Sequence, residues 1–105
     1  MKTYRVIQTE DAAKAIHDRV HYIIDRYSND QAATAVWEDY KNTRDSLATT
    51  AGSIAEPESR ALQERGLKRI NFSSHDYFIL FRIENDVVYI VSVFHFLEDF
   101  EKKIK

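Results

Sequence analysis

Residues 66–99 read GLKRINFSSHDYFILFRIENDVVYIVSVFHFLED and contain three segments with the pattern of β-strands. In the first segment Ile70 and Phe72 alternate with polar residues, and the second is a nearly continuous apolar run, as expected of a central strand. Short connections join them, and the Asn85-Asp86 turn has residues that tolerate a positive φ. The predicted strands are residues 67–73, 77–84 and 87–94. Together they predict an antiparallel meander.

The chain before this meander has mostly helical periodicity. After a short predicted strand at residues 3–8, apolar side chains recur every three or four positions over residues 11–27, which predicts a helix with one apolar stripe. Residues 31–49 predict a second helix, with Ser28 and Gln31 forming a capping box before it. Because so few residues separate the two helices, they must fold back as an antiparallel hairpin. The stripe of the first helix comprises Ile16, Val20, Ile23, Ile24 and Tyr27.

The segment between the hairpin and the meander is the least regular. Gly52 is suited to end the second helix, and Pro57 is suited to the first turn of a short helix over residues 58–65 that stops at Gly66. After the meander the chain turns helical again, with one apolar face. The residues of that face are Leu97, Phe100 and Ile104.

The whole pattern predicts an α+β fold with the order β-α-α-β-β-β and a short C-terminal helix, in which the helical hairpin packs on an antiparallel-rich sheet. A single domain over residues 1–105 is expected at this length. The chain has no cysteine, which excludes disulfide and thiolate chemistry. Neither a signal peptide nor a membrane-length apolar run is recognisable, which predicts a cytoplasmic protein. The net charge of −2 does not favour a strong nucleic-acid binder.

Three motifs in the meander resemble those of the RelE/ParE superfamily of toxins. Residues 66–69, Gly-Leu-Lys-Arg, are similar to the family's Gly-Leu-Arg segment, and residues 77–83 to its tyrosine-led strand with an aromatic-Arg-apolar step. Residues 91–95, followed by Asp99, are similar to its last strand, which closes on a histidine. The resemblance implies the growth-inhibiting toxin of a type II toxin–antitoxin system, of the kind linked to plasmid stabilisation. It also implies a cognate antitoxin protein as partner in a hetero-oligomer, with no cofactor and no membrane.

The resemblance leaves two activities open. RelE-like members cut messenger RNA in the ribosomal A site without a metal, as endoribonucleases (mRNA interferases), using basic residues with a tyrosine or a histidine. ParE-like members poison DNA gyrase and cleave nothing themselves. Long helices, low basicity and an apolar central strand favour the ParE-like interpretation here. A third alternative is a non-toxic protein-interaction module on the same fold, because fold alone does not determine function.

Candidate site residues differ between these interpretations. A ribonuclease would use its basic groups to activate the 2′-hydroxyl and stabilise the phosphorane, with a carboxylate such as Glu58 or Glu64 approaching. A binding toxin would instead use a C-terminal surface. The ribonuclease candidates are Lys68, Arg69, Arg82 and His95. The partner-binding candidates are Phe100, Lys102 and Lys103, with Lys105 beside them.

Each candidate also has a purely structural interpretation. Arg69 and Arg82 would lie on the solvent side of the sheet, paired with Glu84 or Asp86, and His95 would cap the final helix. Tyr22, Tyr27, Trp37 and Tyr40 are most simply core or helix-face residues. His17, His21 and Asp25 are spaced four residues apart on one helix face. Chance is the favoured explanation of this spacing, so no metal site is predicted.

Overall fold

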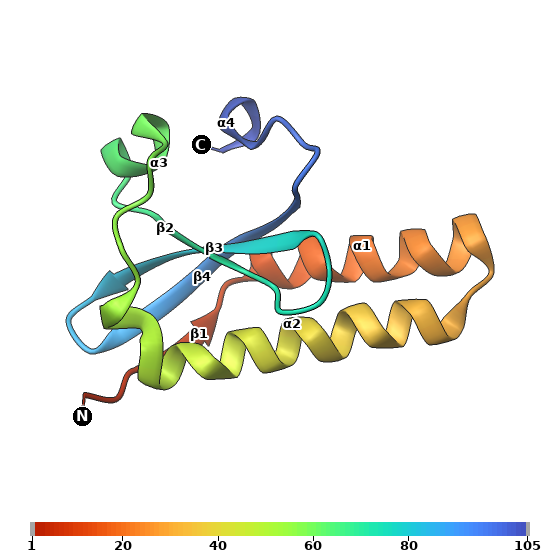
Figure 1. Cartoon of the computed structure of the whole chain (residues 1–105), viewed down its shortest axis with the longest axis horizontal. Helices are drawn as coiled ribbons and strands as arrows, with labels where there is room; N and C mark the ends of the chain where they lie inside the picture. The colour runs from red at the N-terminus through yellow and green to blue at the C-terminus, as the bar shows by residue number, and fades with distance from the viewer. Residues whose placement is uncertain (1, 105) are drawn as a thin grey trace.

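The computed structural model of the chain describes residues 2–104 and has the predicted order of elements (Figure 1). One 3-10 turn, η1, follows the second helix. The elements are β1 (Arg5–Gln8), α1 (Glu10–Tyr27), α2 (Asp30–Thr50), η1 (Ala51–Ser53), α3 (Arg60–Glu64), β2 (Lys68–Asn71), β3 (Tyr77–Glu84), β4 (Val87–His95) and α4 (Phe100–Lys103). The predicted α+β fold with a helical hairpin and an antiparallel-rich sheet is therefore confirmed.

The sheet is mixed, with the strand order β1-β4-β3-β2. Strands β2, β3 and β4 form the predicted antiparallel meander, and β1 pairs in parallel with β4. Strand β1 covers only the first half of β4, from Val87 to Ile90. A bulge at the Leu80/Phe81 step of the β3–β4 pairing shifts the register of the second half. Because β1 ends at Gln8, opposite Ile90, the second half of β4 has no neighbouring strand on the β1 side within residues 2–104.

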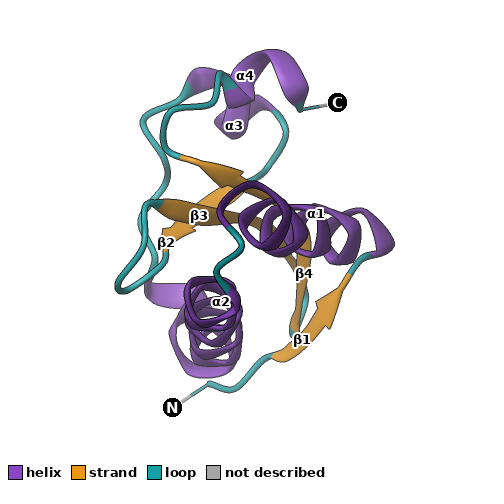
Figure 2. Ribbon diagram, turned by 90° about the vertical axis from the view of Figure 1, so that its right-hand side faces the viewer, coloured by secondary structure: helices purple, strands orange, loops and turns teal. Residues whose placement is uncertain are grey.

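The helices α1 and α2 lie side by side on one face of the sheet, and their far end projects beyond the strands (Figures 1 and 2). Thr9 caps α1 by accepting a bond from the Ala12 amide at 3.2 Å. Asn29 caps α2 in the same way, so the predicted capping box at Ser28 is wrong. Ser28 instead ends α1, in a left-handed conformation with φ 48°. Ser28 was expected to cap the start of α2, whereas it caps the end of α1.

Most of the core lies between the hairpin and the sheet. Its centre is formed by fully buried side chains from α1, α2, β3 and β4, such as Ile16, Tyr40, Phe81 and Ile90. A smaller cluster lies on the opposite face, beneath α3 and α4. The buried members of this small cluster are Leu62, Leu67, Phe78, Leu80 and Phe94, with Val91, Phe100 and Ile104 packed against them.

Several apolar predictions fail at the ends of elements. Tyr27 is 64% exposed, because the end of α1 extends past the sheet. Tyr22 is 57% exposed although the next residue, Ile23, is buried, because Tyr22 lies off the apolar stripe of the helix. Leu97 is 90% exposed, since it precedes α4 rather than lying on its apolar face. Phe100 and Ile104 do pack on the small cluster, as expected.

The predictions around α3 are partly wrong. Ser59 caps α3, so Pro57 lies before the helix and not in its first turn. Gly66 has φ 67° just after α3, which confirms its predicted role as a helix stop. Gly52 lies inside η1 with no positive φ, and the hydroxyl of Tyr4 occupies the space that a side chain would need. Gly52 therefore provides space and does not form a left-handed cap.

Among residues 2–104, no helix combines the length and the apolar character that crossing a membrane requires.

Candidate functional site

The four ribonuclease candidates do not converge. Side chains alternate between the faces of a strand, and cross-strand partners share a face. Lys68 is opposite Phe81, and His95 is opposite Tyr77, so both are on the face that α1 and α2 cover. Arg69 is opposite Leu80, and Arg82 lies two residues along β3, so both are on the other face. The sheet itself separates the set into two pairs.

Each of these side chains is also held by a local partner. The Lys68 ammonium donates to the carbonyl of Ile54 at 2.8 Å. Arg69 donates to the Asn71 amide oxygen at 2.9 Å and lies 3.8 Å from the centroid of the Phe78 ring. These contacts orient the two cations within the fold.

The expected pairing of Arg82 with Glu84 is present, at 2.8 Å. Arg82 also lies over the Tyr89 ring, 4.5 Å from its centroid. His95 accepts a bond from the Leu97 amide at 3.1 Å, so it caps the turn that leaves β4. It had been expected to cap the final helix, which it does not do.

The two carboxylates considered for the ribonuclease site are elsewhere. Glu64 pairs with Arg60 along α3 at 3.3 Å. Glu58 lines a small groove at the β2 edge together with Arg69 and Phe100. The structure therefore brings Glu58 near one candidate, Arg69, and leaves Glu64 on its own helix.

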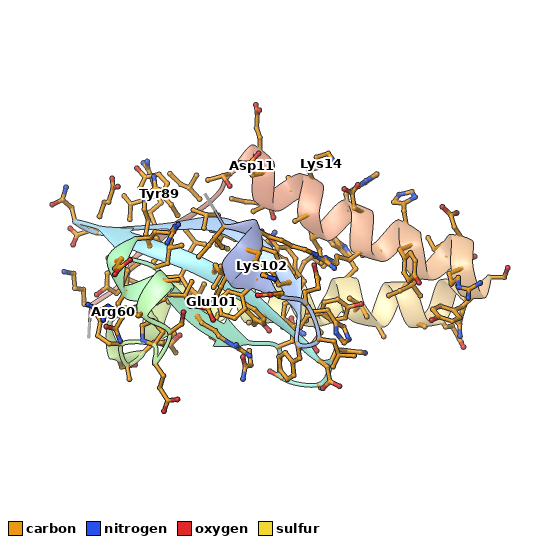
Figure 3. The ribbon with its side chains drawn as sticks, turned by 90° about the horizontal axis from the view of Figure 1, so that it is seen from above. Asp11, Lys14, Arg60, Tyr89, Glu101 and Lys102 are labelled. Carbon is orange, nitrogen blue, oxygen red and sulfur yellow. The ribbon has the colours of Figure 1, made fainter. Side chains whose placement is uncertain are left out.

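A cavity of about 950 Å³ lies between α1 and residues 96–104, called here the C-terminal arm. Its floor is the second half of β4, residues 91–95. One wall is the exposed face of α1, which includes Asp11 and Lys14, and Figure 3 shows these two on the upper side of that helix. Arg65 and Arg82 reach the cavity from the other face of the sheet. Because it is concave and several charged side chains reach it, this cleft is a candidate site.

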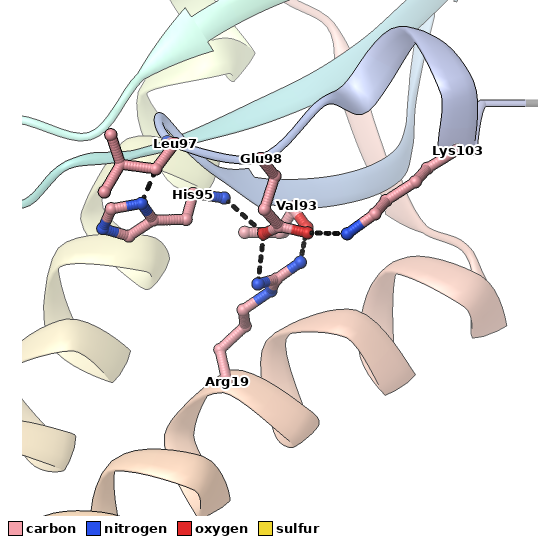
Figure 4. A network of polar contacts seen from close by, with 6 residues as sticks. All are labelled: Arg19, Val93, His95, Leu97, Glu98 and Lys103. Atoms are coloured by element: carbon pink, nitrogen blue, oxygen red, sulfur yellow. Dashed lines mark hydrogen bonds and ion pairs between the residues drawn. The ribbon is translucent and has the colours of Figure 1, made fainter.

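A polar network ties the arm to α1 across the cleft (Figure 4). Glu98 forms an ion pair with Arg19 and a second one with Lys103 at 2.8 Å, and it accepts a bond from the His95 amide at 2.8 Å. Arg19 also donates to the carbonyl of Val93 at 3.3 Å. The Arg19 and Glu98 side chains are only 25% and 17% exposed, so solvent screens this pair less than an ordinary surface pair.

The network changes the acidity of Glu98. Burial raises the pKa of its carboxyl, but the bonds from Arg19, Lys103 and the His95 amide outweigh burial and lower it from 4.5 to about 2. Sequence reasoning missed this site, because Arg19 and Glu98 lie far apart in the chain and neither belongs to a motif. In the sequence, Arg19 is one of several charged residues of α1, and nothing there distinguishes it from the others.

We expect the closed arm to be lost in acid. A carboxyl with a lowered pKa in the folded state stabilises that state above its unfolded pKa, and the contribution disappears as the pH falls through the folded pKa. For Glu98 that window runs from about 4.5 down to about 2. NMR titration of the Glu98 side chain should show its midpoint near the lower value, with the amide signals of the arm shifting in parallel. A midpoint near 4.5 would show that the network does not form in solution.

The partner-binding candidates have different environments. Phe100 packs edge-on against Phe78, with centroids 5.4 Å apart, and so contributes to the small cluster. Lys102 is 85% exposed and lies 3.5 Å from Asp99, whereas Lys103 belongs to the Glu98 network. Figure 3 labels Lys102 at α4, near the middle of the view. Lys105 lies outside the described residues.

The histidines of α1 are neighbours on its surface. The rings of His17 and His21 have centroids 4.0 Å apart. Within residues 2–104, no three histidine or carboxylate side chains are grouped as a metal site.

A second buried carboxylate holds the β2–β3 turn against α2. Asp39, only 8% exposed, accepts bonds from the amides of Ser73 and Ser74 at 3.1 and 2.9 Å. Its carboxylate also lies 2.7 Å from His75 Nδ1. Burial raises the pKa of Asp39, but these bonds outweigh it and lower the pKa below the ordinary value. Asp39 fixes the hairpin that carries β2 and β3 to the helical layer.

Comparison with solved structures finds proteins with a similar fold. A chain of the chromosomal ParDE TA system from P. aeruginosa superposes with a TM-score of 0.72 at 16% identity, over 89% of this chain and 96% of that one. A chain of the toxin–antitoxin complex RelBE2 from Mycobacterium tuberculosis gives a TM-score of 0.58 at 22% identity, over 90% and 93%. No family model and no curated protein match the sequence. The predicted resemblance to the RelE/ParE superfamily is thus confirmed as a shared fold.

Proposed function

We propose that this chain, which has the fold of ParE- and RelE-type proteins, is the toxin of a toxin–antitoxin pair and acts as a gyrase poison. In this proposal it inhibits growth by binding its target protein, and a cognate antitoxin neutralises it. The likeness to a chain of a ParDE system, over nearly the whole length of both chains, supports the toxin role. The likeness to a chain of the RelBE2 complex supports it equally and does not choose the target.

The observation that carries the choice of activity is the separation of the basic candidates. Cleavage of RNA needs an acid, a base and a cation within reach of one phosphate. Lys68 and His95 lie on the opposite face of the sheet from Arg69 and Arg82. Of the four, Arg82 and His95 line the cleft and Lys68 and Arg69 do not, so the four do not form one set around a phosphate. This dispersal favours a toxin that binds over one that cleaves.

The projecting end of the helical hairpin offers a surface for such a target. Tyr22 and Tyr27 are largely exposed there and contact each other edge to face, with centroids 6.2 Å apart. Exposed tyrosines that remain in van der Waals contact present a rigid apolar area with polar tips, which is the usual composition of an energetic centre in a protein interface. We assign target contact to this aromatic pair.

The test is a gyrase assay with purified protein. We expect the chain to trap gyrase–DNA cleavage complexes on supercoiled plasmid, and we expect a double variant, Tyr22→Ala with Tyr27→Ala, to need at least tenfold more protein for the same effect. Loss of two exposed interface aromatics corresponds to about 2 kcal/mol or more of binding free energy. The matched control is Tyr89→Ala on the opposite face of the sheet. Unchanged supercoiling and no cleavage at saturating wild-type protein would exclude gyrase as the target.

One observation supports the RelE-like alternative. Two of the candidates, Arg82 and His95, line the same cleft, together with the further cations Lys14, Arg19, Arg65 and Lys103. If the chain is instead a ribosome-dependent endonuclease, primer extension in a translating extract will show cuts in the A site. Those cuts would be lost with Arg82→Ala. Intact messages together with unaffected gyrase activity, and no growth arrest on induction without an antitoxin, would leave the non-toxic interaction module.

A further inference from the structure

Two histidine rings approach each other on the exposed side of α1. His17 and His21 are one turn apart, and both are exposed. Side chains four residues apart on a helix are neighbours, with Cβ atoms about 5–6 Å apart. That spacing alone does not predict a metal site, because helix surfaces carry such pairs by chance. The structure adds what the sequence could not show, which is that the ring centroids are 4.0 Å apart and the ring planes are inclined by only 32°.

The fold makes little use of these two rings. The His17 side chain is 66% exposed, and neither histidine belongs to a core cluster. Within residues 2–104, no group bonds to the ring nitrogens of His21. In the other two histidines, His75 and His95, Nδ1 has a partner in the fold. The pair on α1 is therefore open to a ligand from solution.

Asp18 favours one tautomer of the His17 ring. Its Oδ1 lies 3.7 Å from Nδ1 of His17, while its Oδ2 accepts a bond from the Lys14 ammonium at 2.6 Å. A proton on Nδ1 faces this carboxylate, so Nε2 of His17 keeps its lone pair. Histidines that bind a metal commonly direct their other ring nitrogen at a carboxylate in this way, which fixes the ring and raises its basicity.

We propose that His17 and His21 chelate one divalent cation of the class that imidazole nitrogen prefers, namely Zn²⁺, Cu²⁺ or Ni²⁺. Neutral imidazole suits these ions, whereas Mg²⁺ and Ca²⁺ require oxygen ligands. Two histidines one helical turn apart supply two ligands to one ion, as they do in helical zinc motifs. Within residues 2–104, no third histidine or carboxylate is grouped with them, so water completes the coordination.

Asp25 contributes charge to this site and no ligand. It lies six residues beyond the midpoint between the two histidines, which is about 9 Å along a helix that rises 1.5 Å per residue. A carboxylate at that distance attracts the cation without touching it. Asp25 is exposed, and within residues 2–104 it has no ion-pair partner, so it can be replaced without disturbing another contact.

Binding at this pair stabilises the folded chain. The ion connects two positions that only the helical conformation holds one turn apart, and a ligand that prefers the folded state raises its stability by mass action. The stabilised turn is in α1, next to Tyr22. Metal binding at α1 does not depend on which target the chain attacks, because the site is made of α1 residues alone.

The experiment titrates the full chain, labelled with ¹⁵N, with zinc chloride or magnesium chloride at mildly alkaline pH. We expect zinc to shift the ring nitrogen signals of His17 and His21 and the amide signals of residues 16–22, with one ion bound per chain. The ring signals of His75 and His95 should stay in place. Magnesium should shift none of these signals. Zinc should also raise the melting temperature, and copper should displace zinc, because Cu²⁺ binds nitrogen ligands more tightly.

Four variants make the test specific. His17→Gln and His21→Gln each leave one ligand, so we expect either to weaken zinc binding at least tenfold. Asp18→Asn should weaken it by a smaller factor, about threefold, because Asp18 orients His17 and does not touch the ion. The matched control is Asp25→Asn, which should bind zinc within twofold of the wild type. All four positions are exposed, and melting without metal establishes that each variant is folded.

The proposal is overturned if His17→Gln and His21→Gln bind zinc as tightly as the wild type. Shifts at the rings of His75 or His95 in place of the pair overturn it as well. Equal binding of zinc and magnesium would show that carboxylates hold the ion, and no shift at millimolar zinc would show that there is no site. Failure of the gyrase assay leaves the result untouched, because the metal titration contains no gyrase.

Discussion

Replacing Phe81 with alanine is expected to lower the free energy of unfolding by about 4 kcal/mol, the usual cost of truncating a fully buried phenylalanine. Phe81 has no exposed surface. It is paired with Lys68 on one side and with Ile90 on the other, so it lies in the middle of the sheet, on the face that α1 and α2 cover. The bulge beside it fixes the strand, which limits how far the cavity can collapse.

A loss of this size is a large fraction of the stability of a small domain, which is about 5–15 kcal/mol in total. Urea unfolding followed by the fluorescence of Trp37, the single tryptophan, measures it directly. Phe81→Leu should cost much less, about 1 kcal/mol, because it leaves most of the volume filled. Phe96→Ala, at a phenylalanine that is 42% exposed, is the control for truncation at the surface. If Phe81→Ala and Phe96→Ala lowered stability equally, the described core would be wrong.

Replacing Asp39 with alanine is the second substitution for which we expect a large effect, a loss of about 3 kcal/mol in the free energy of unfolding. Hydrogen bonds to a charged group contribute about 1.5–3 kcal/mol each, and donors left without an acceptor add the cost of their desolvation. The Asp39 carboxylate serves three donors in the β2–β3 turn, on Ser73, Ser74 and His75. Losing it frees this turn from α2.

Asp45→Ala is the matched control, because Asp45 lies on the same helix but is 70% exposed and pairs only with its neighbour Arg44. It should change the unfolding free energy by less than about 0.5 kcal/mol, as surface pairs do. His75→Ala should give an intermediate loss, since Asp39 keeps its two amide donors. Hydrogen exchange at Ser73 and Ser74 should accelerate in Asp39→Ala. Unchanged exchange there would mean that the carboxylate does not hold the turn.

The sheet could be predicted from the sequence because its signal is local. Period-two alternation and two short polar connections define β2, β3 and β4, and Asn85 does adopt the positive φ, 56°, that its turn was expected to require. The hairpin of α1 and α2 follows from helical periodicity in the same way. What periodicity cannot show is where an element ends relative to its neighbours. Tyr27 continues the apolar stripe of α1 beyond the last strand that could cover it.

The candidate site was harder to predict from the sequence than the fold, for two different reasons. Arg19 and Asp39 find their partners in segments that come much later in the chain, and no spacing rule connects such residues. The dispersal of the basic set, in contrast, follows partly from the sequence. Lys68 and Arg69 are adjacent in a predicted strand, so their side chains must leave from opposite faces. Treating them as one cluster overlooked that alternation.

The parallel pairing of β1 with β4 also has a consequence for synthesis. Thr9, at the end of β1, bonds to Ile90 across 81 positions of the chain, so the first strand to emerge from the ribosome waits for the last. β4 lies between β1 and β3 in the sheet, and until it has been made β1 has no strand to join. Contacts of such long range slow folding. The sheet can therefore be completed only after β4 has been translated, and a nascent chain that ends before β4 lacks the strand that forms the floor of the cleft.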